Sequence, residues 1–388
     1  MNTSLAHYAT SRDNNFNLIR YFAAVLVLIS HSYPIALGPS AGEPIGRAIG
    51  MTGGTIAVDI FFISSGFLIT SSYFARQNIL YFVWARALRI YPALVVSNLF
   101  CVFVIGAAFT TLSLREYLSS PMIGSFLWTN SHLFSGVYYW LPGVFENNPY
   151  AHAINGSLWT LPYELQMYCL LAATLLAMGF LGKRTRLVSG RVILLLVAVG
   201  SVTLNLANHF YGLFPIHFFH LFSMFAVGTA CFLWRDKIVL SHLILFLLPV
   251  LAVSSQTNYY VFRSLYSVGL PFLIFYLAYV PAGGVRHFNR LGDYSYGLYI
   301  YAFPVQQSLA LLVPGISVWA MILWATAIAT VLAALSWHTV EKRFLKLKPW
   351  IENLSRYRSK VPWTRAAQAN VGNPPGPQAA ATRPRRVE

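Results

Sequence analysis

Two residues of one apolar stretch could do chemistry inside a membrane. Arg20 and His31 lie eleven residues apart within the segment 17–36. In a helix this spacing places them about 20° apart around the axis and ~16 Å apart along it, so both lie on one face. A charge at the centre of a spanning helix costs roughly 2.5–3.5 kcal/mol, and such residues usually face the bundle interior and serve a function. The alternative is an arginine that reaches the headgroups and a histidine that is hydrogen-bonded inside the bundle.

Two carboxylates are expected at the depth of His31. If the helices alternate from a cytoplasmic N-terminus, His31, Asp59 and Glu164 all lie about 8–10 Å below the outer membrane surface. A histidine beside a carboxylate is the usual arrangement for a general base that is held in one tautomer. The three residues therefore form a candidate catalytic group, and a purely structural polar network is the alternative.

A second charged group is expected at the cytoplasmic boundary. Arg86 and Arg89 are three residues apart, which makes them neighbours on one face of a helix, and Arg20 is expected at the same level. The guanidinium fork matches phosphate geometry, so the group could hold a phosphorylated cytosolic ligand. The alternative is that these arginines only anchor the orientation of the chain in the membrane, which needs no ligand. From these residues alone, this alternative is favoured.

Other polar residues of the apolar segments have simpler interpretations. The run 64–66 (Ser-Ser-Gly) is typical of close helix packing, although a serine nucleophile is an alternative. His217 and His220 have the spacing of half a metal site, but no third ligand lies nearby in the sequence. Gln306 and Gln307 are expected to bond between helices, with contact to a sugar as the alternative.

The composition is that of an all-α integral membrane protein. Of 388 residues, 57% are hydrophobic and 10% are charged, and the mean hydropathy is +0.57. Three isolated cysteines provide neither a disulfide framework nor a metal-binding spacing, and no removable signal peptide is evident. The apolar runs predict a bundle of about ten transmembrane helices near 17–36, 52–73, 90–110, 157–180, 191–210, 213–234, 238–254, 261–280, 294–314 and 317–340.

The net charge of +16 is explained by membrane orientation rather than by nucleic-acid binding. With both termini in the cytoplasm, the outside loops hold only Arg47, Arg115 and Arg263. Most other basic residues lie in inside loops and in the C-terminal tail, as the positive-inside rule requires. Localisation in the cell inner (plasma) membrane as a multi-pass protein is therefore expected, without a nucleic-acid partner.

The chain divides into a membrane domain and two cytoplasmic ends. Residues 1–16 form a polar N-terminal segment, 17–345 the membrane domain, and 346–388 a basic tail that we expect to be disordered from about 360. Between the third and fourth helices lies an outside loop, 111–156, that is rich in Trp and Tyr. We interpret it as a cap over the bundle, with a re-entrant segment near 121–141 as an open alternative.

Taken together, six motifs in order resemble a known family. They are Arg20 and His31 with ten residues between them, GTIAVDIFFISSGFLI, RALRIYPA, SLWTLPYELQMY, SYGLYIYAFPV and SWHTVEKRF. The chain resembles, over about residues 10–345, the acyltransferase-3 family of membrane acyltransferases, which O-acylate bacterial surface glycans, nodulation factors and antibiotics. The resemblance implies acyl-CoA, usually acetyl-CoA, as cytoplasmic co-substrate, and no metal.

The resemblance also implies roles for individual residues. It implies His31 as the catalytic residue, Arg20 as its motif partner, Arg86 and Arg89 as the cytoplasmic arginine pair, Glu164 as the acid after the Trp-Thr-Leu run and Asp59 as the motif aspartate. Many members have a histidine where this chain has Ala302, so that position cannot take part in the chemistry here. Some members carry a further helix and a fused SGNH esterase-like domain. Because this chain ends without either, we expect it to act alone or with separate polysaccharide-synthesis proteins.

These observations predict a transfer across the membrane. A CoA nucleotide at Arg20, Arg86 and Arg89 would extend its pantetheine arm along the bundle to present the thioester near His31. A glycan or lipid-linked glycan would arrive from outside, and His31 would act as general base or carry the acyl group. The rival hypothesis is a proton-coupled transporter that uses the intramembrane histidine and carboxylates, although no internal repeat supports it.

Overall fold

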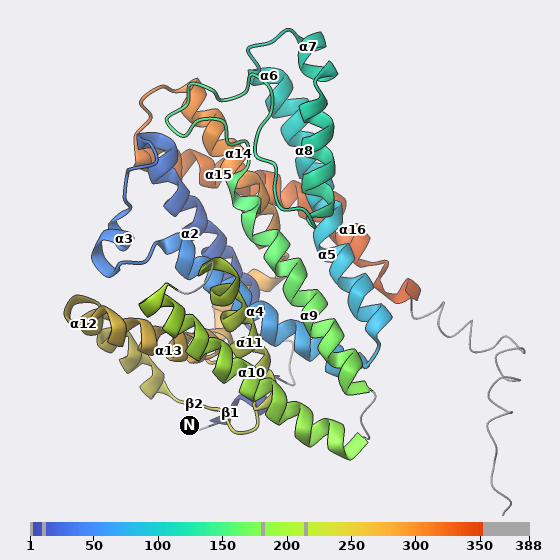
Figure 1. The fold of residues 1–388 in the computed structure, drawn as a ribbon, viewed down its shortest axis with the longest axis vertical. Helices are drawn as coiled ribbons and strands as arrows, with labels where there is room; N and C mark the ends of the chain where they lie inside the picture. The colour runs from blue at the N-terminus through green and yellow to red at the C-terminus, as the bar shows by residue number, and fades with distance from the viewer. Residues whose placement is uncertain (1–2, 10–12, 180–182, 213–215, 352–388) are drawn as a thin grey trace, which may run out of the picture.

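The computed structural model describes residues 3–9, 13–179, 183–212 and 216–351, and its described part is an all-α bundle (Figure 1). The predicted disordered tail lies outside the described residues. The ten main helices are α2 (Phe16–Leu37), α4 (Gly53–Arg76), α5 (Ile79–Phe100), α9 (Leu161–Gly179), α10 (Lys183–Tyr211), α11 (Ile216–Leu233), α12 (Leu247–Thr257), α13 (Tyr259–Tyr279), α14 (Ser295–Leu312) and α15 (Val318–Ser336).

Short elements connect and extend these helices. The α-helical ones are α1 (Leu5–Ala9), α3 (Pro44–Ile49), α6 (Ala107–Phe109), α7 (Leu114–Ser119), α8 (Pro121–His132) and α16 (Lys342–Leu345). The 3-10 turns are η2 (Gly156–Thr160), η3 (His242–Phe246) and η4 (Gly283–Arg290), and the π-helical turns are η1 (Cys101–Gly106) and η5 (Trp337–Glu341). Two short strands, β1 (Thr3–Ser4) and β2 (Val239–Leu240), pair antiparallel and fasten the N-terminus to the connection after α11.

Each of the ten predicted intervals contains a helix, but fewer satisfy the length and hydropathy of a span. Among the described residues, six helical stretches are long and apolar enough to cross a membrane, namely 16–37, 53–76, 79–109, 190–211, 259–279 and 318–351. The chain is therefore a multi-helix membrane protein. The count of about ten spans and the cytoplasmic location of both termini stay predictions.

The third helix is longer than the sequence predicts. We expected it over 90–110, and this start is wrong: α5 begins at Ile79. The Asn78 side chain caps it by accepting a 3.0 Å hydrogen bond from the Tyr81 amide, and α5 continues through η1 to residue 109. Arg86 and Arg89, which we expected in the connection before this helix, therefore lie within it.

Helices α4 and α11 pack in close backbone contact, as the run 64–66 predicts. A Cβ at Gly66 would overlap the carbonyl of Phe225, and a Cβ at Gly228 would overlap that of Ile63. Small residues at a helix interface let two backbones approach within a membrane. Close packing is thus confirmed, and it holds the middle of α4 against α11.

We expect Gly66→Leu to disrupt this contact. Overpacking of a core usually costs ~1–3 kcal/mol, and here the obstacle is backbone that cannot move aside. The fraction of monodisperse protein after detergent extraction should fall severalfold. Gly124→Leu is the matched control, because nothing lies within 4 Å of a Cβ at Gly124. Equal recovery of both variants would contradict the role assigned to Gly66.

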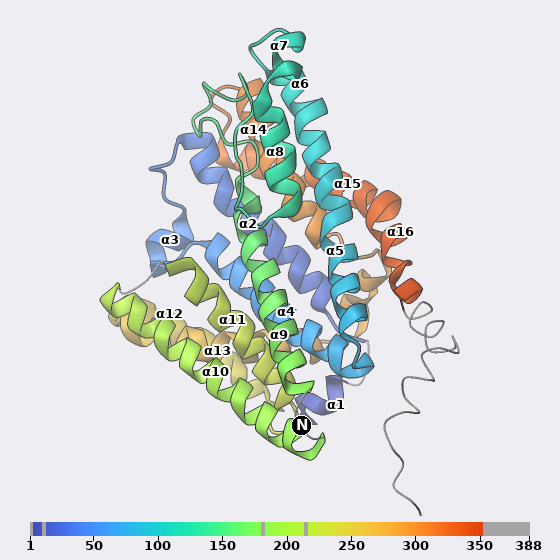
Figure 2. The same cartoon turned by 45° about the vertical axis from the view of Figure 1, so that its right-hand side comes forward.

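The 111–156 loop is a structured cap over one end of α5. In Figures 1 and 2, α7 and α8 lie at the top of the bundle, whereas the N-terminus and the turn between α4 and α5 lie at the opposite end. The cap has its own core on α5: Tyr117 of α7 is fully buried and donates a 2.9 Å hydrogen bond to the Val102 carbonyl of η1. Helix α8 is the only part of the predicted 121–141 segment that the structure describes as helical.

Candidate functional site

One cavity brings His31 and Asp59 together near the end of the bundle where the cap lies. It has a volume of about 650 Å³ and is lined from α2, α4, η2, α10, α11, α13 and α14 and from the connections around α3. Four histidines face it: His31, His209, His217 and His220. Thr55, His217 and Tyr259 lie in the first turns of α4, α11 and α13, and His209 lies in the last turn of α10.

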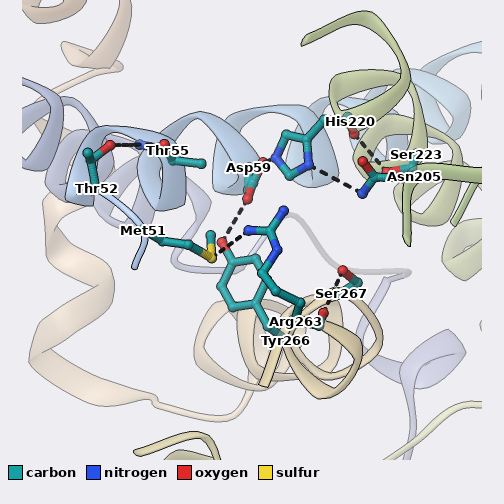
Figure 3. Close-up of polar contacts among 10 residues, drawn as sticks. All are labelled: Met51, Thr52, Thr55, Asp59, Asn205, His220, Ser223, Arg263, Tyr266 and Ser267. Carbon is teal, nitrogen blue, oxygen red and sulfur yellow. Dashed lines mark hydrogen bonds and ion pairs between the residues drawn. The ribbon is translucent and has the colours of Figure 1, made fainter. Parts of the chain in front are cut away.

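Asp59 does not pair with His31 but with His220 (Figure 3). The Asp59 carboxylate is fully buried, and its Oδ1 lies 2.6 Å from Nε2 of His220 on α11. Its Oδ2 accepts a 2.7 Å hydrogen bond from the Tyr266 hydroxyl of α13. Nδ1 of His220 lies 3.3 Å from the Asn205 amide of α10. Because both ring nitrogens of His220 are occupied, this pair connects four helices and leaves no free nitrogen as a base.

The His31 ring has a nitrogen without a hydrogen-bond partner in the described part of the chain. Its Nδ1 is buried without a hydrogen-bond partner among the described residues. The ring is held on one side by an edge-to-face contact with Phe303 of α14, with centroids 5.2 Å apart. A buried polar atom without a partner is costly and calls for an explanation. Because His31 also lines the cavity, its ring is a candidate partner for a ligand there.

Glu164 lies in a separate, smaller cavity with Arg20. This cavity, of about 30 Å³, adjoins the larger one, because Val58 and Tyr299 line both. Glu164 accepts a hydrogen bond from the Tyr168 hydroxyl one turn along α9. The Nε of Arg20 is buried without a partner in the described structure. The structure thus places Glu164 with the arginine, whereas the sequence analysis grouped it with His31.

Arg86 and Arg89 have different surroundings although they are neighbours on α5. The Arg89 guanidinium contacts Asp293 at 2.5 Å and Glu341 at 3.1 Å, and the π-helical turn η5 carries Glu341 into this position. Burial alone would raise the pKa of Asp293, but the Arg89 and Arg20 guanidiniums and the hydrogen bonds from Ser295 together hold that pKa below its ordinary value. Arg86 interacts with Glu164 at longer range and has no ion pair within the described chain. Arg86 is therefore the more available cation.

The segment that leads into the motif SLWTLPYELQMY is hydrogen-bonded to the motif SYGLYIYAFPV, and together they form part of the cavity wall. Asn155 donates a 2.7 Å hydrogen bond to the Ile300 carbonyl, and the Tyr299 hydroxyl donates a 2.6 Å bond to the Ser157 carbonyl. Gly156 leaves room for the Phe303 ring, which a Cβ would overlap. The contact orients Tyr299 toward both cavities and holds Phe303 against His31.

Polar residues of α14 hold this part of the wall in place by hydrogen bonds to α2 and to the cap. The Gln306 amide donates to the Leu28 carbonyl at 2.8 Å and to the Ser32 hydroxyl at 2.7 Å, which confirms bonding between helices. Gln307 likewise bonds the 148–153 segment of the cap. Ala302 packs in an apolar cluster with α2 and α15 and does not line the cavity.

An aromatic cavity lies beside the His31 cavity. It has a volume of about 420 Å³, its walls include Tyr139, Trp140 and Tyr150 of the cap, and it shares Pro39 and Trp159 with the His31 cavity. Aromatic side chains offer large apolar faces with a polar edge. A ligand that spans both cavities would enter beneath the cap.

Sequence reasoning missed three residues of this site. His220 was considered only as half of a metal site with His217; in fact it pairs with Asp59, while His217 contacts the Trp159 ring at 5.0 Å. No group of three potential ligands among the described residues could hold a metal ion. Arg263 and Tyr266 both face this region, and the only available signal was their spacing at the start of an apolar helix.

Comparison with known proteins agrees with the motifs. Residues 13–339 match the model of a family described as an acyltransferase domain. The chain is 30% identical to an O-acetyl transferase of Shigella phage Sf6 over 346 residues, covering 86% of this chain and 96% of that protein. It is 26% identical to Nodulation protein 10 of Rhizobium leguminosarum bv. viciae over 364 residues, covering 88% of this chain and 95% of that protein. No solved structure matches the chain.

Proposed function

Because the chain belongs to the acyltransferase family, we propose that it is a membrane O-acetyltransferase that transfers an acyl group from cytoplasmic acyl-CoA to a hydroxyl of a glycan. One observation carries the proposal: His31 presents a buried, unbonded ring nitrogen beside a cavity of about 650 Å³. The O-acetyl transferase of the phage supports acetyl as the group transferred. The family assignment does not favour the transporter hypothesis.

The His31 imidazole would act as a general base. It would take the proton of the acceptor hydroxyl while the oxygen attacks the thioester carbonyl carbon; the carbon–sulfur bond would then break, and the CoA thiolate would leave and be protonated. In the alternative, an imidazole nitrogen attacks the thioester carbonyl carbon and the CoA thiolate leaves; the acceptor hydroxyl then attacks the acyl-imidazole, loses its proton and releases the free imidazole. The Phe303 contact would orient the ring in both cases.

The donor would approach from the side of the bundle where Arg20 and Arg86 lie. Arg20 and Arg86 are the cations that we assign to the phosphates of CoA, because Arg89 is already paired with two carboxylates. The small cavity at Arg20 adjoins the His31 cavity through Val58 and Tyr299, which supports a path for the pantetheine arm. At about 30 Å³ this cavity holds roughly one water, so its walls must separate to admit the arm.

The acceptor would approach beneath the cap, over Trp140 and Trp159. Aromatic faces suit a sugar ring, and the acceptor would be a free or lipid-linked glycan. We also propose the inner (plasma) membrane as the location, surrounding lipid as a contact, and polysaccharide-synthesis proteins as functional partners.

Labelled acetyl-CoA distinguishes an enzyme from a transporter. Washed membranes that contain the protein and its host's glycans should release free CoA and place label on the glycan. Mass spectrometry of surface polysaccharide with and without the gene then identifies the acceptor. Uptake of label without release of CoA would refute the proposed activity.

The proposal requires the two substrates to approach from opposite faces. Gln77, in the turn between α4 and α5, and Asn147, in the cap, lie at opposite ends of the 79–109 helix, which is about 46 Å long. With the native cysteines replaced, Gln77→Cys should react with an impermeant thiol reagent only from the cytoplasm, and Asn147→Cys only from outside. Labelling of both from one face would refute the proposed orientation.

A further inference from the structure

A buried arginine faces the His31 cavity without a carboxylate partner. Arg263, one turn into α13, is only 6% exposed and lines the cavity (Figure 3). Its Nη1 contacts the Met51 sulfur at 2.6 Å, its Nε has no partner, and the guanidinium lies 6.0 Å from the Tyr266 ring centre. Among the described residues, no carboxylate oxygen comes within 4 Å of it. A thioether is a weak acceptor for a cation.

Both acids of the cavity wall are already engaged. Asp59 is bonded on its two oxygens by His220 and Tyr266. Glu43 accepts a hydrogen bond from the Gly53 amide at the start of α4. Each therefore has a closer partner than Arg263. A buried cation is costly unless it is paired and hydrogen-bonded, so the arginine is suited to a negative group that the protein itself does not supply.

The helices around the cavity reinforce a positive potential. Helices α4, α11 and α13 all begin at its wall, where Thr55, His217 and Tyr259 line it, while α2 and α10 end there. A helix N-terminus carries a partial positive charge and favours an anion. The three N-termini outnumber the two C-termini, so the helix ends make a small net positive contribution beside the Arg263 guanidinium.

We propose that this part of the cavity is an anionic subsite centred on Arg263, and that the acceptor places a carboxylate or phosphate oxygen there. The inference rests on the proposed function, because it assigns the ligand to the acceptor glycan. The guanidinium fork can bond two oxygens of one such group. An acidic sugar would supply a carboxylate, and a lipid-linked glycan would supply a phosphate.

Ligand-induced thermal stabilisation of the purified full-length protein tests the subsite without acyl transfer. The probes are glucuronate, glucose 1-phosphate and uncharged glucose, at ionic strength matched with sodium chloride. We expect the better anionic sugar to bind at least about tenfold more tightly than glucose, as one or two charge-assisted hydrogen bonds would provide. A preference for glucuronate would indicate an acidic sugar in the acceptor, and a preference for glucose 1-phosphate would indicate the phosphate of a lipid-linked glycan.

Variants of Arg263 test whether this residue causes the preference for anionic sugars. Arg263→Gln should remove the preference for anions, and Arg263→Lys should retain part of it. Arg115→Gln, on the exposed α7, is the matched control and should behave as the unmodified protein. No anion preference in the unmodified protein would overturn the subsite, even if Arg263→Gln fails to fold. An unchanged preference in Arg263→Gln would overturn it too, whether or not acyl transfer occurs.

Discussion

Replacement of His31 by alanine is expected to abolish acyl transfer while the protein stays folded in the membrane. The Nδ1 atom of His31 has no partner within the described structure, so its removal breaks no hydrogen bond at that atom and relieves an unsatisfied buried group. Loss of a general base lowers a rate by roughly 10²–10⁴-fold. The measurement is acceptor-dependent release of CoA by washed membranes with matched amounts of protein.

His287→Ala is the control for this variant. His287 lies on the exposed face of η4, outside the His31 cavity, and its loss should leave transfer unchanged. Near-normal transfer by a well-expressed His31→Ala protein would refute the mechanism. Incubation of the unmodified protein with labelled acetyl-CoA and no acceptor then separates the two roles: label bound covalently at His31 indicates an acyl-imidazole, and its absence favours a general base.

Apolar length and periodicity predicted the order and type of the helices. All ten predicted intervals contain a helix because ~20 apolar residues in succession have few alternatives in a membrane. The start of α5 was predicted eleven residues too late, because two arginines normally indicate a membrane boundary. Their interpretation required knowing that Asp293 and Glu341, over 200 residues away, would meet Arg89.

The site was predictable as a set of residues but not as a set of pairs. The estimated depth placed His31 and Asp59 near one another, and they do line one cavity. Depth does not specify azimuth, however, and the close approach of α4 to α11 at Gly66 and Gly228 turns Asp59 toward His220. Glu164, which we expected at the same depth, instead lines the smaller cavity with Arg20. Such pairings depend on helix rotation, which a single sequence does not encode locally.

Substitution of Arg89 by glutamine should unfold the protein, whereas the same change at Arg86 should not. Without the Arg89 guanidinium, Asp293 and Glu341 lose the cation that joins them, and Glu341 is only 2% exposed. Removal of one partner from a buried ion pair costs about 3–5 kcal/mol, a large share of the stability of a typical protein. Thermal melting in detergent and the yield of monodisperse protein measure this loss.

The double variant Arg89→Gln, Glu341→Gln separates charge from packing. It removes the Glu341 carboxylate, one of the two that lose their cation in Arg89→Gln. The double variant should therefore recover part of the melting temperature that Arg89→Gln loses. If Arg89→Gln melts normally and instead binds acyl-CoA more weakly, then Asp293 and Glu341 do not depend on Arg89 for stability. In that case Arg89 binds the donor, as the sequence analysis expected.

Arg86→Gln provides the contrast on the same face of the same helix. Because Arg86 has no ion pair in the described chain, its loss strands no carboxylate within 4 Å. If it holds a phosphate of CoA, the apparent affinity for acyl-CoA should fall about tenfold or more, since hydrogen bonds to charged groups contribute roughly 1.5–3 kcal/mol. High salt should diminish the difference, because it screens the attraction of exposed phosphates. A normal affinity in a folded Arg86→Gln protein would leave Arg20 as the only proposed cation for the donor.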